Sequence, residues 1–202
     1  MMPNATPVAT ILFILTIGFS VYSFYLNKNL IEKFALNPYA IKRHRKYASL
    51  ILSGFLHSNF PHLLFNMLSF YFFAFPLERA IGSLNFLILY IGSLIIANIP
   101  TVIKEKDNPQ YRAIGASGAI SGVIFSFILF EPMMGILIFP IPFPLPAFVF
   151  GILYLLWSYF AAKQDRDLIN HSAHFWGAIS GIILTIFLEP NSIKFFLGNF
   201  VK

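Results

Sequence analysis

Residues 115–122 read Gly-Ala-Ser-Gly-Ala-Ile-Ser-Gly, and they open an apolar run that continues to about residue 130. The run is long enough to enter a lipid bilayer. Its residues 118–122, Gly-Ala-Ile-Ser-Gly, form a GxxxG pattern. Small residues one turn apart let two membrane helices approach closely. The same five residues recur at 177–181 in another apolar run. We therefore expect the two helices that contain these copies to pack together.

The composition is that of an integral membrane protein. Hydrophobic residues make up 57% of the 202 residues and charged residues 11%, whereas soluble proteins have about 25% charged residues. The charged residues lie between long apolar runs, as expected if only the loops meet water. The net charge of +6 is spread over several loops without a nucleic-acid motif. We therefore expect it to face a membrane surface and expect no nucleic-acid partner.

The apolar runs predict an all-α fold. They indicate six transmembrane helices, at about 8–27, 62–77, 86–103, 115–130, 147–162 and 172–188. The first run has no Lys or Arg before it and no small-residue cleavage site after it, so we interpret it as a transmembrane helix and not as a signal peptide. The prediction is one membrane domain over residues 1–202, a six-transmembrane-helix bundle with a core at about 8–190.

Two connections have a distinctive composition. The longest, at about 28–61, carries Lys42, Arg43, Arg45 and Lys46, which favours either a membrane-surface element or a partner site. The other, residues 139–146, has proline at every second position. Proline removes backbone donors and disfavours helix, so we expect an extended connector between the fourth and fifth helices.

Polar residues lie where three of the predicted helices begin. His62 and Asn66 belong to the second helix, Ser117 to the fourth and His174 to the sixth. In a chain that crosses the bilayer at each span, these three helix starts lie on the same side of the membrane. His62 and Asn66 are one turn apart and share a helix face. The pattern predicts one shallow polar site near one membrane surface.

These residue types suggest nucleophilic catalysis. The chain has no cysteine, so a nucleophile must be an oxygen. A serine hydroxyl needs a base, and neutral histidine suits that role near pH 7. We expect Ser117 to be the nucleophile and His174 the base, in a dyad without a carboxylate. His62, the Asn66 amide and the backbone N–H of Ser117 could then donate to the oxyanion.

Each motif also has a structural interpretation. Gly-Ala-Ser-Gly alone could be a packing motif, and His62 with Asn66 could form interhelical hydrogen bonds. His171 with His174 could be an interfacial pair or two ligands of a metal, although no HExxH motif or carboxylate cluster accompanies them. The joint placement at three helix starts favours catalysis. The metal interpretation is therefore disfavoured.

Four stretches resemble the rhomboid family of intramembrane serine proteases. They are residues 57–66 (His-Ser-Asn-Phe-Pro-His-Leu-Leu-Phe-Asn), 78–83 (Glu-Arg-Ala-Ile-Gly-Ser), 115–118 (Gly-Ala-Ser-Gly) and 173–177 (Ala-His-Phe-Trp-Gly). The resemblance implies that Ser117 is the nucleophile, His174 the base, and His62 and Asn66 the oxyanion-stabilising side chains. It also implies a six-helix core that cleaves transmembrane protein substrates near the bilayer surface, without a metal or cofactor.

The sequence departs from the family pattern at two places. Many rhomboids have a Trp-Arg pair in the first loop, where this chain has Tyr47-Ala48-Ser49. Many also have an aromatic residue four positions after the nucleophile, where this chain has Ser121. We expect Trp176 or a hydrogen bond from Ser121 to hold His174 instead.

The leading hypothesis is an intramembrane serine endopeptidase in a bacterial-type inner membrane. The departures keep a second hypothesis open, a non-catalytic rhomboid-like protein that binds membrane clients. A small transporter is the third, and the sequence lacks the paired broken helices that it would need. Most of the 14 Lys and Arg residues lie in the first, third and fifth loops. This opposes the positive-inside tendency in the orientation that the resemblance implies, which we nevertheless favour.

Overall fold

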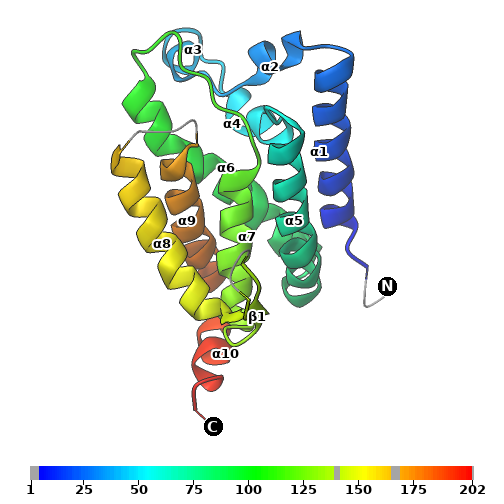
Figure 1. Ribbon diagram of the computed structural model, residues 1–202, viewed down its shortest axis with the longest axis vertical. Coiled ribbons are helices and arrows are strands. Elements are labelled where there is room, and N and C mark those ends of the chain that lie inside the picture. The colour runs from blue at the N-terminus through cyan, green and yellow to red at the C-terminus, as the bar shows by residue number, and fades with distance from the viewer. Residues whose placement is uncertain (1–4, 139–141, 165–168, 202) are drawn as a thin grey trace.

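The computed structural model describes residues 5–138, 142–164 and 169–201 and shows a helical bundle (Figure 1). Its long helices are α1 (Pro7–Tyr25), α5 (Phe60–Ile81), α6 (Ser83–Glu105), α7 (Ser117–Phe130), α8 (Ala147–Gln164) and α9 (His171–Leu188). Each predicted apolar run corresponds to one of them, so the six-helix prediction is confirmed. Five are long and apolar enough to cross a membrane, and α7 is a shorter apolar helix of 14 residues.

The ends of α5 and α6 differ from the prediction. α5 continues to Ile81 and α6 to Glu105, past the expected ends at 77 and 103. The apolar runs stop where charged residues such as Glu78 and Lys104 appear, but these residues keep helical backbone hydrogen bonds. Hydrophobicity therefore marked the ends of the apolar surface and not the ends of the helices.

The short helix α7 forms the centre of the bundle (Figure 1). All its residues from Gly118 to Ile128 are buried. It packs against α5, α6 and α9, and its contact with α9 is the most extensive in the bundle. A helix that is apolar on every side is expected at such a position.

Glycines bring α7 and α9 into backbone contact, as the repeated motif predicts. A Cβ atom on Gly177 would overlap the carbonyl oxygen of Gly118, and one on Gly181 would overlap that of Gly122. Helix α6 also comes close, since a Cβ on Gly118 would lie 2.7 Å from the Ala97 Cβ of α6. Only glycine allows this approach, which gives membrane helices their van der Waals contact where lipid supplies no hydrophobic drive.

A buried carboxylate fixes the start of α1. Glu78 of α5 is 1% exposed. It accepts hydrogen bonds from the backbone N–H groups of Val8 (3.1 Å) and Ala9 (2.6 Å) and from the Ser83 hydroxyl (2.6 Å). The first backbone N–H groups of a helix lack intrahelical partners and favour a negative charge. The carboxylate therefore joins α1 to the turn between α5 and α6.

The first loop is a folded element. It contains α2 (Asn29–Phe34), α3 (Pro38–His44), α4 (Ser49–Leu52) and the 3-10 helix η1 (Ser53–Phe55), none of which the sequence predicted. Leu36 and Ala113 pair through two backbone hydrogen bonds, of 2.8 and 3.2 Å. The Asn98 amide of α6 donates to the Leu50 carbonyl at 3.1 Å. These bonds anchor the loop without the Trp-Arg pair, and Tyr47 is 57% exposed.

The connection between α7 and α8 contains a pair of short strands. Strand β1 (Gly135–Ile136) pairs antiparallel with β2 (Leu145–Pro146). The predicted extended connector is confirmed at Leu145–Pro146, residues 142 and 143 form bends, and residues 139–141 lie outside the described part of the chain. A final helix, α10 (Ser192–Gly198), follows α9 and packs against α7, with Phe195 near Phe130.

Large apolar side chains cover the outer faces of the bundle. On α5 they include Phe65, 69% exposed, and on α8 Phe160, 57% exposed. Such surfaces are costly in water and suit a lipid environment. The protein is an integral membrane protein.

Candidate active site

A capped helix start positions His62 and Asn66. The Asn59 side chain accepts a hydrogen bond from the backbone N–H of His62 at 2.9 Å, and Pro61 lies in the first turn of α5. Both features favour a helix start at this point. One turn later, the Asn66 amide donates to the His62 carbonyl at 2.9 Å. This bond uses one of the two N–H groups of the amide.

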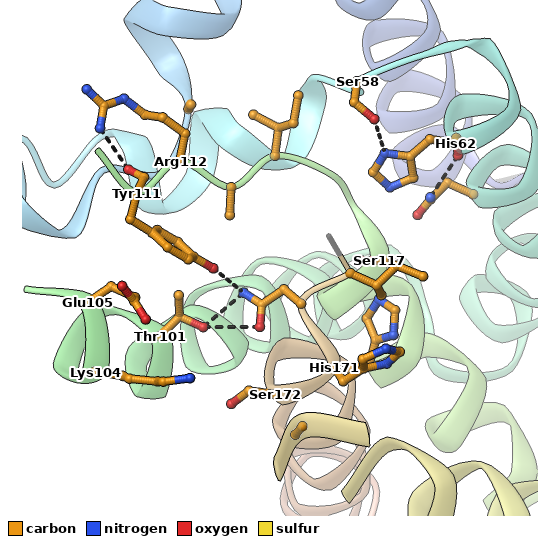
Figure 2. Close-up of a pocket in the computed structure, with 18 of the residues that line it drawn as sticks. Ser58, His62, Thr101, Lys104, Glu105, Tyr111, Arg112, Ser117, His171 and Ser172 are labelled. Atoms are coloured by element: carbon orange, nitrogen blue, oxygen red, sulfur yellow. Dashed lines mark hydrogen bonds between the residues drawn. The ribbon is translucent and has the colours of Figure 1, made fainter. Parts of the chain in front are cut away.

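The His62 ring is held at Nδ1. The Ser58 hydroxyl lies 3.1 Å from His62 Nδ1 (Figure 2). The ring also lies against His57 in an edge-to-face contact, with 4.8 Å between ring centroids and 71° between planes. Two neighbours thus restrict the imidazole, and Nε2 is the nitrogen that Ser58 leaves open.

Glycine 115 lets the loop before α7 pass next to this ring. Its φ is +128°, which L side chains rarely adopt, and its N–H donates to the Ser53 carbonyl at 3.0 Å. A Cβ here would lie 2.9 Å from His62 Nε2 and 4.0 Å from Ser117 Oγ. The His62 imidazole and the Ser117 hydroxyl are therefore near neighbours, on either side of a position that only glycine can occupy.

The start of α9 is fixed by Asn170, which sequence reasoning did not single out. Its side-chain oxygen accepts from the Ala173 N–H at 3.0 Å. Its amide donates to the Thr101 hydroxyl of α6 at 2.9 Å and to the Tyr111 hydroxyl at 3.4 Å (Figure 2). Asparagine just before an apolar run is a helix-start signal that could have indicated this role.

One cavity joins the three helix starts. Its volume is about 820 Å³, and the four residues singled out in the sequence, Ser117, His174, His62 and Asn66, all line it. Lys104, Glu105 and Arg112 line it too, and Figure 2 shows them across the cavity from Ser117. The cavity therefore extends from the helix starts that carry Ser117, His62 and His174 to an end lined by charged side chains.

Comparison with known proteins places this arrangement in a family. Residues 44–191 match the family described as Rhomboid domain. The chain belongs to the rhomboid family. The match covers α5, α6, α7, α8 and α9 and all the cavity-lining residues except Ile31 and Ala35.

Several relatives carry rhomboid names. The rhomboid-named protein YdcA of Bacillus subtilis is 48% identical over 81 residues, which are 40% of this chain and 39% of YdcA. Rhomboid protein 1, mitochondrial, of Saccharomyces cerevisiae is 30% identical over 67% of this chain and 40% of its own length. Rhomboid protease AarA of Providencia stuartii is 27% identical over 80% of this chain and 63% of its own length. The chain spans less than two thirds of the length of each.

The contacts of His174 differ from the sequence-based expectation for this rhomboid. Trp176 is 42% exposed and forms a ring pair with Phe175, so its expected role is wrong. Ser121 does not bond to His174; its hydroxyl lies 2.7 Å from the Tyr154 hydroxyl of α8. The Tyr154 ring is stacked on His174, with 6.3 Å between centroids and 25° between planes. His174 lies in the first turn of α9, and the ring that stacks on it comes from α8.

His171 also packs against His174. The two rings meet edge-to-face at 5.9 Å, and Trp157 packs edge-on against His171 at 4.6 Å. His171 is 4% exposed. It is therefore packed inside the protein and is not the solvated interfacial residue that one interpretation of the sequence suggested.

His57 is a buried neutral histidine beside the cavity. Its Nδ1 lies 3.0 Å from the Ser20 hydroxyl of α1, which itself donates to the Phe55 carbonyl at 3.1 Å. Because that hydroxyl proton is used, His57 Nδ1 is the donor and Nε2 carries no proton. Burial, and to a smaller extent the neighbouring His62, lowers the pKa of His57 to about 3. The cavity therefore has next to it a histidine that is uncharged at physiological pH.

Proposed function

We propose that this rhomboid-family protein is an intramembrane serine endopeptidase that cleaves transmembrane segments of membrane-anchored proteins. The observation that supports this most strongly is the shared cavity lined by Ser117, His174, His62 and Asn66. The close backbone contact of α7 with α9 adds support, because it sets the start of one helix beside the start of the other.

In the proposed mechanism, Ser117 and His174 act as a dyad. His174 takes the proton of the Ser117 hydroxyl while Oγ attacks the carbonyl carbon of the substrate. The protonated imidazole then gives its proton to the leaving amine, and an acyl-enzyme forms. Water from the charged end of the cavity, activated by His174, attacks the ester and releases the second product.

His62 and Asn66 would stabilise the oxyanion. When the Ser58 hydroxyl donates to His62 Nδ1, the ring proton lies on Nε2, which is free to donate to the substrate. Asn66 uses one N–H on the His62 carbonyl and keeps another. The backbone N–H groups at the start of α7 would add partial positive charge.

A substrate must present an extended peptide to this site. In a membrane helix every backbone carbonyl is hydrogen-bonded, so the segment must unwind before attack. The cavity of about 820 Å³ is large enough for several side chains of an unwound segment and for water. Transmembrane segments that unwind easily are therefore the proposed substrate class.

The test is cleavage of a reporter transmembrane protein in liposomes by wild type, Ser117→Ala, His174→Ala and Asn66→Ala. We expect cleavage by wild type, none by the first two variants, and about 10²- to 10³-fold slower turnover in Asn66→Ala, because one oxyanion donor is lost. Unchanged turnover in Asn66→Ala would remove that residue from the mechanism. Cleavage that persists in Ser117→Ala would refute the assignment of the nucleophile.

The same experiment tests the client-binding alternative. That function predicts capture of membrane clients by wild type and by Ser117→Ala equally, with cleavage by neither. One reason for considering it was the missing ring at position 121, and the Tyr154 ring on His174 weakens that reason.

We also propose location in a bacterial-type inner membrane with a cytosolic N-terminus, which protease accessibility of tagged termini in oriented vesicles would test.

A further inference from the structure

Tyr154 connects the two helices that carry the proposed dyad. Its hydroxyl lies 2.7 Å from Ser121 Oγ, and the Ser121 hydroxyl donates to the Ser117 carbonyl at 2.9 Å. A hydroxyl has one proton to donate, so the Tyr154 hydroxyl must be the donor to Ser121. The hydrogen bonds run from α8 through Ser121 to the backbone of Ser117.

The ring of the same tyrosine faces the imidazole of His174. The centroid distance of 6.3 Å and the angle of 25° lie within the range of favourable offset stacking. Phe125 of α7 and Phe150 of α8 pack on the tyrosine ring, each with its centroid 5.7 Å away. The ring is thus held at its edge by a hydrogen bond and on its sides by two aromatic residues.

We propose that Tyr154 is the positioning residue that holds His174 toward Ser117, with the Ser121 hydroxyl as its anchor. The inference rests on the proposed dyad. It also explains the serine at position 121. Ser121 is 2% exposed and forms a hydrogen-bonded pair with Tyr154. The ring that packs on His174 therefore comes from α8 and not from α7.

The placement has a mechanical consequence. Of the 18 residues of α8, 17% are buried inside the protein. The corresponding shares are 44% for the 18 most apolar consecutive residues of α6 and 39% for the 18 residues of α9. The orientation of His174 therefore depends on the position of α8, the least buried of these three helices. A displacement of α8 would break the stacking and the Ser121 bond together.

The test compares Tyr154→Leu, Tyr154→Phe and Ser121→Ala with Phe160→Leu, a matched change of an exposed ring on the same helix. In the liposome assay we expect Tyr154→Leu to lower kcat by about 10- to 100-fold with KM unchanged, because the base is misplaced while the substrate still binds. Tyr154→Phe keeps the ring and should recover most of that loss. Phe160→Leu should resemble wild type.

A double-mutant cycle guards against simple loss of folding. Tyr154→Phe and Ser121→Ala both remove the Tyr154–Ser121 hydrogen bond, and Ser121→Ala also removes the bond to the Ser117 carbonyl, so the combination should cost no more than Ser121→Ala alone. Additive losses, a loss confined to KM, or equal effects of Tyr154→Leu and Phe160→Leu would each overturn the proposal.

An activity-independent readout separates this inference from the proposed function. In nuclear magnetic resonance of histidine-labelled protein, the His174 ring signal, assigned by its disappearance in His174→Ala, should move in Tyr154→Leu and stay in Phe160→Leu. If the signal moves but wild type cleaves nothing, the enzymatic proposal fails and the contact stands. If wild type cleaves and neither kcat nor the signal changes, only the role of Tyr154 is wrong.

Discussion

Helices α9 and α8 both contact the short central helix α7, but in different ways. Between α7 and α9 the contact is made by backbone atoms, with no room for a Cβ at Gly177 or Gly181. Between α7 and α8 it is made by side chains. A Cβ on Gly151 of α8 would meet the ends of Ile128 and Phe125 at 3.1 and 3.3 Å, and such side chains can adjust.

The difference separates two tasks in the proposed site. The backbone contact sets the positions of the helix starts that carry Ser117 and His174, with little freedom to shift. The side-chain contact from α8 sets the orientation of the imidazole through Tyr154. Changes at the glycines of the α7–α9 contact should therefore act on folding, whereas changes at Tyr154 of α8 should act on turnover.

The largest effect is expected from Gly181→Ala. Its Cβ would overlap the Gly122 carbonyl oxygen, and backbone atoms cannot move away as side chains can. We expect a loss of more than about 3 kcal/mol in unfolding free energy. The measurement is the midpoint of denaturant titration in detergent.

The matched control for this change is Gly151→Ala on α8. It should cost about 1 kcal/mol or less, because helix propensity gained by alanine offsets the small adjustment of Ile128. Similar losses in the two variants would contradict the distinction between backbone and side-chain contact.

A smaller loss is expected far from the cavity, at Glu78→Gln. The glutamine NH₂ would face either the N–H of Ala9 or the donors at the other oxygen, so at least one donor loses its acceptor. We expect about 2 kcal/mol lower stability. At a temperature where both proteins are folded, turnover should equal that of wild type, since the cavity is untouched. A selective loss of turnover would show that the α1 junction acts on the site.

The smallest effect is a pH dependence from His57. Its folded-state pKa of about 3 lies below the usual value of 6.5, so the unfolded chain binds the proton first as the pH falls. Stability should therefore be full above pH 6.5 and decline between pH 6.5 and 3, by about 1 kcal/mol from pH 6 to pH 5. Unfolding midpoints of wild type and His57→Gln at the two pH values measure this. An equal decline in both proteins would exclude His57 as the cause.

The sequence predicted the six helices because their apolar runs are long, and it predicted the α7–α9 contact because its glycine pattern is repeated. It also singled out four polar residues that line one cavity, since polar groups at helix starts stand out in apolar runs. Tyr154 was missed. It lies among many aromatic residues of α8, and sequence does not tell which of them faces inward. Glu78 lies in one of the four family-like stretches. Its hydrogen bonds to α1, however, join positions that are separated by 69 and 70 residues, and such distant pairs have no local signal in the sequence.

The central claim is that Ser117 is an activated nucleophile. Labelling of purified protein in liposomes with a fluorophosphonate, followed by mass spectrometry of the labelled peptide, tests it most directly. We predict modification at Ser117 in wild type and its loss in both Ser117→Ala and His174→Ala. Absence of labelling in folded wild type, or labelling in His174→Ala at the wild-type rate, would contradict the proposed dyad.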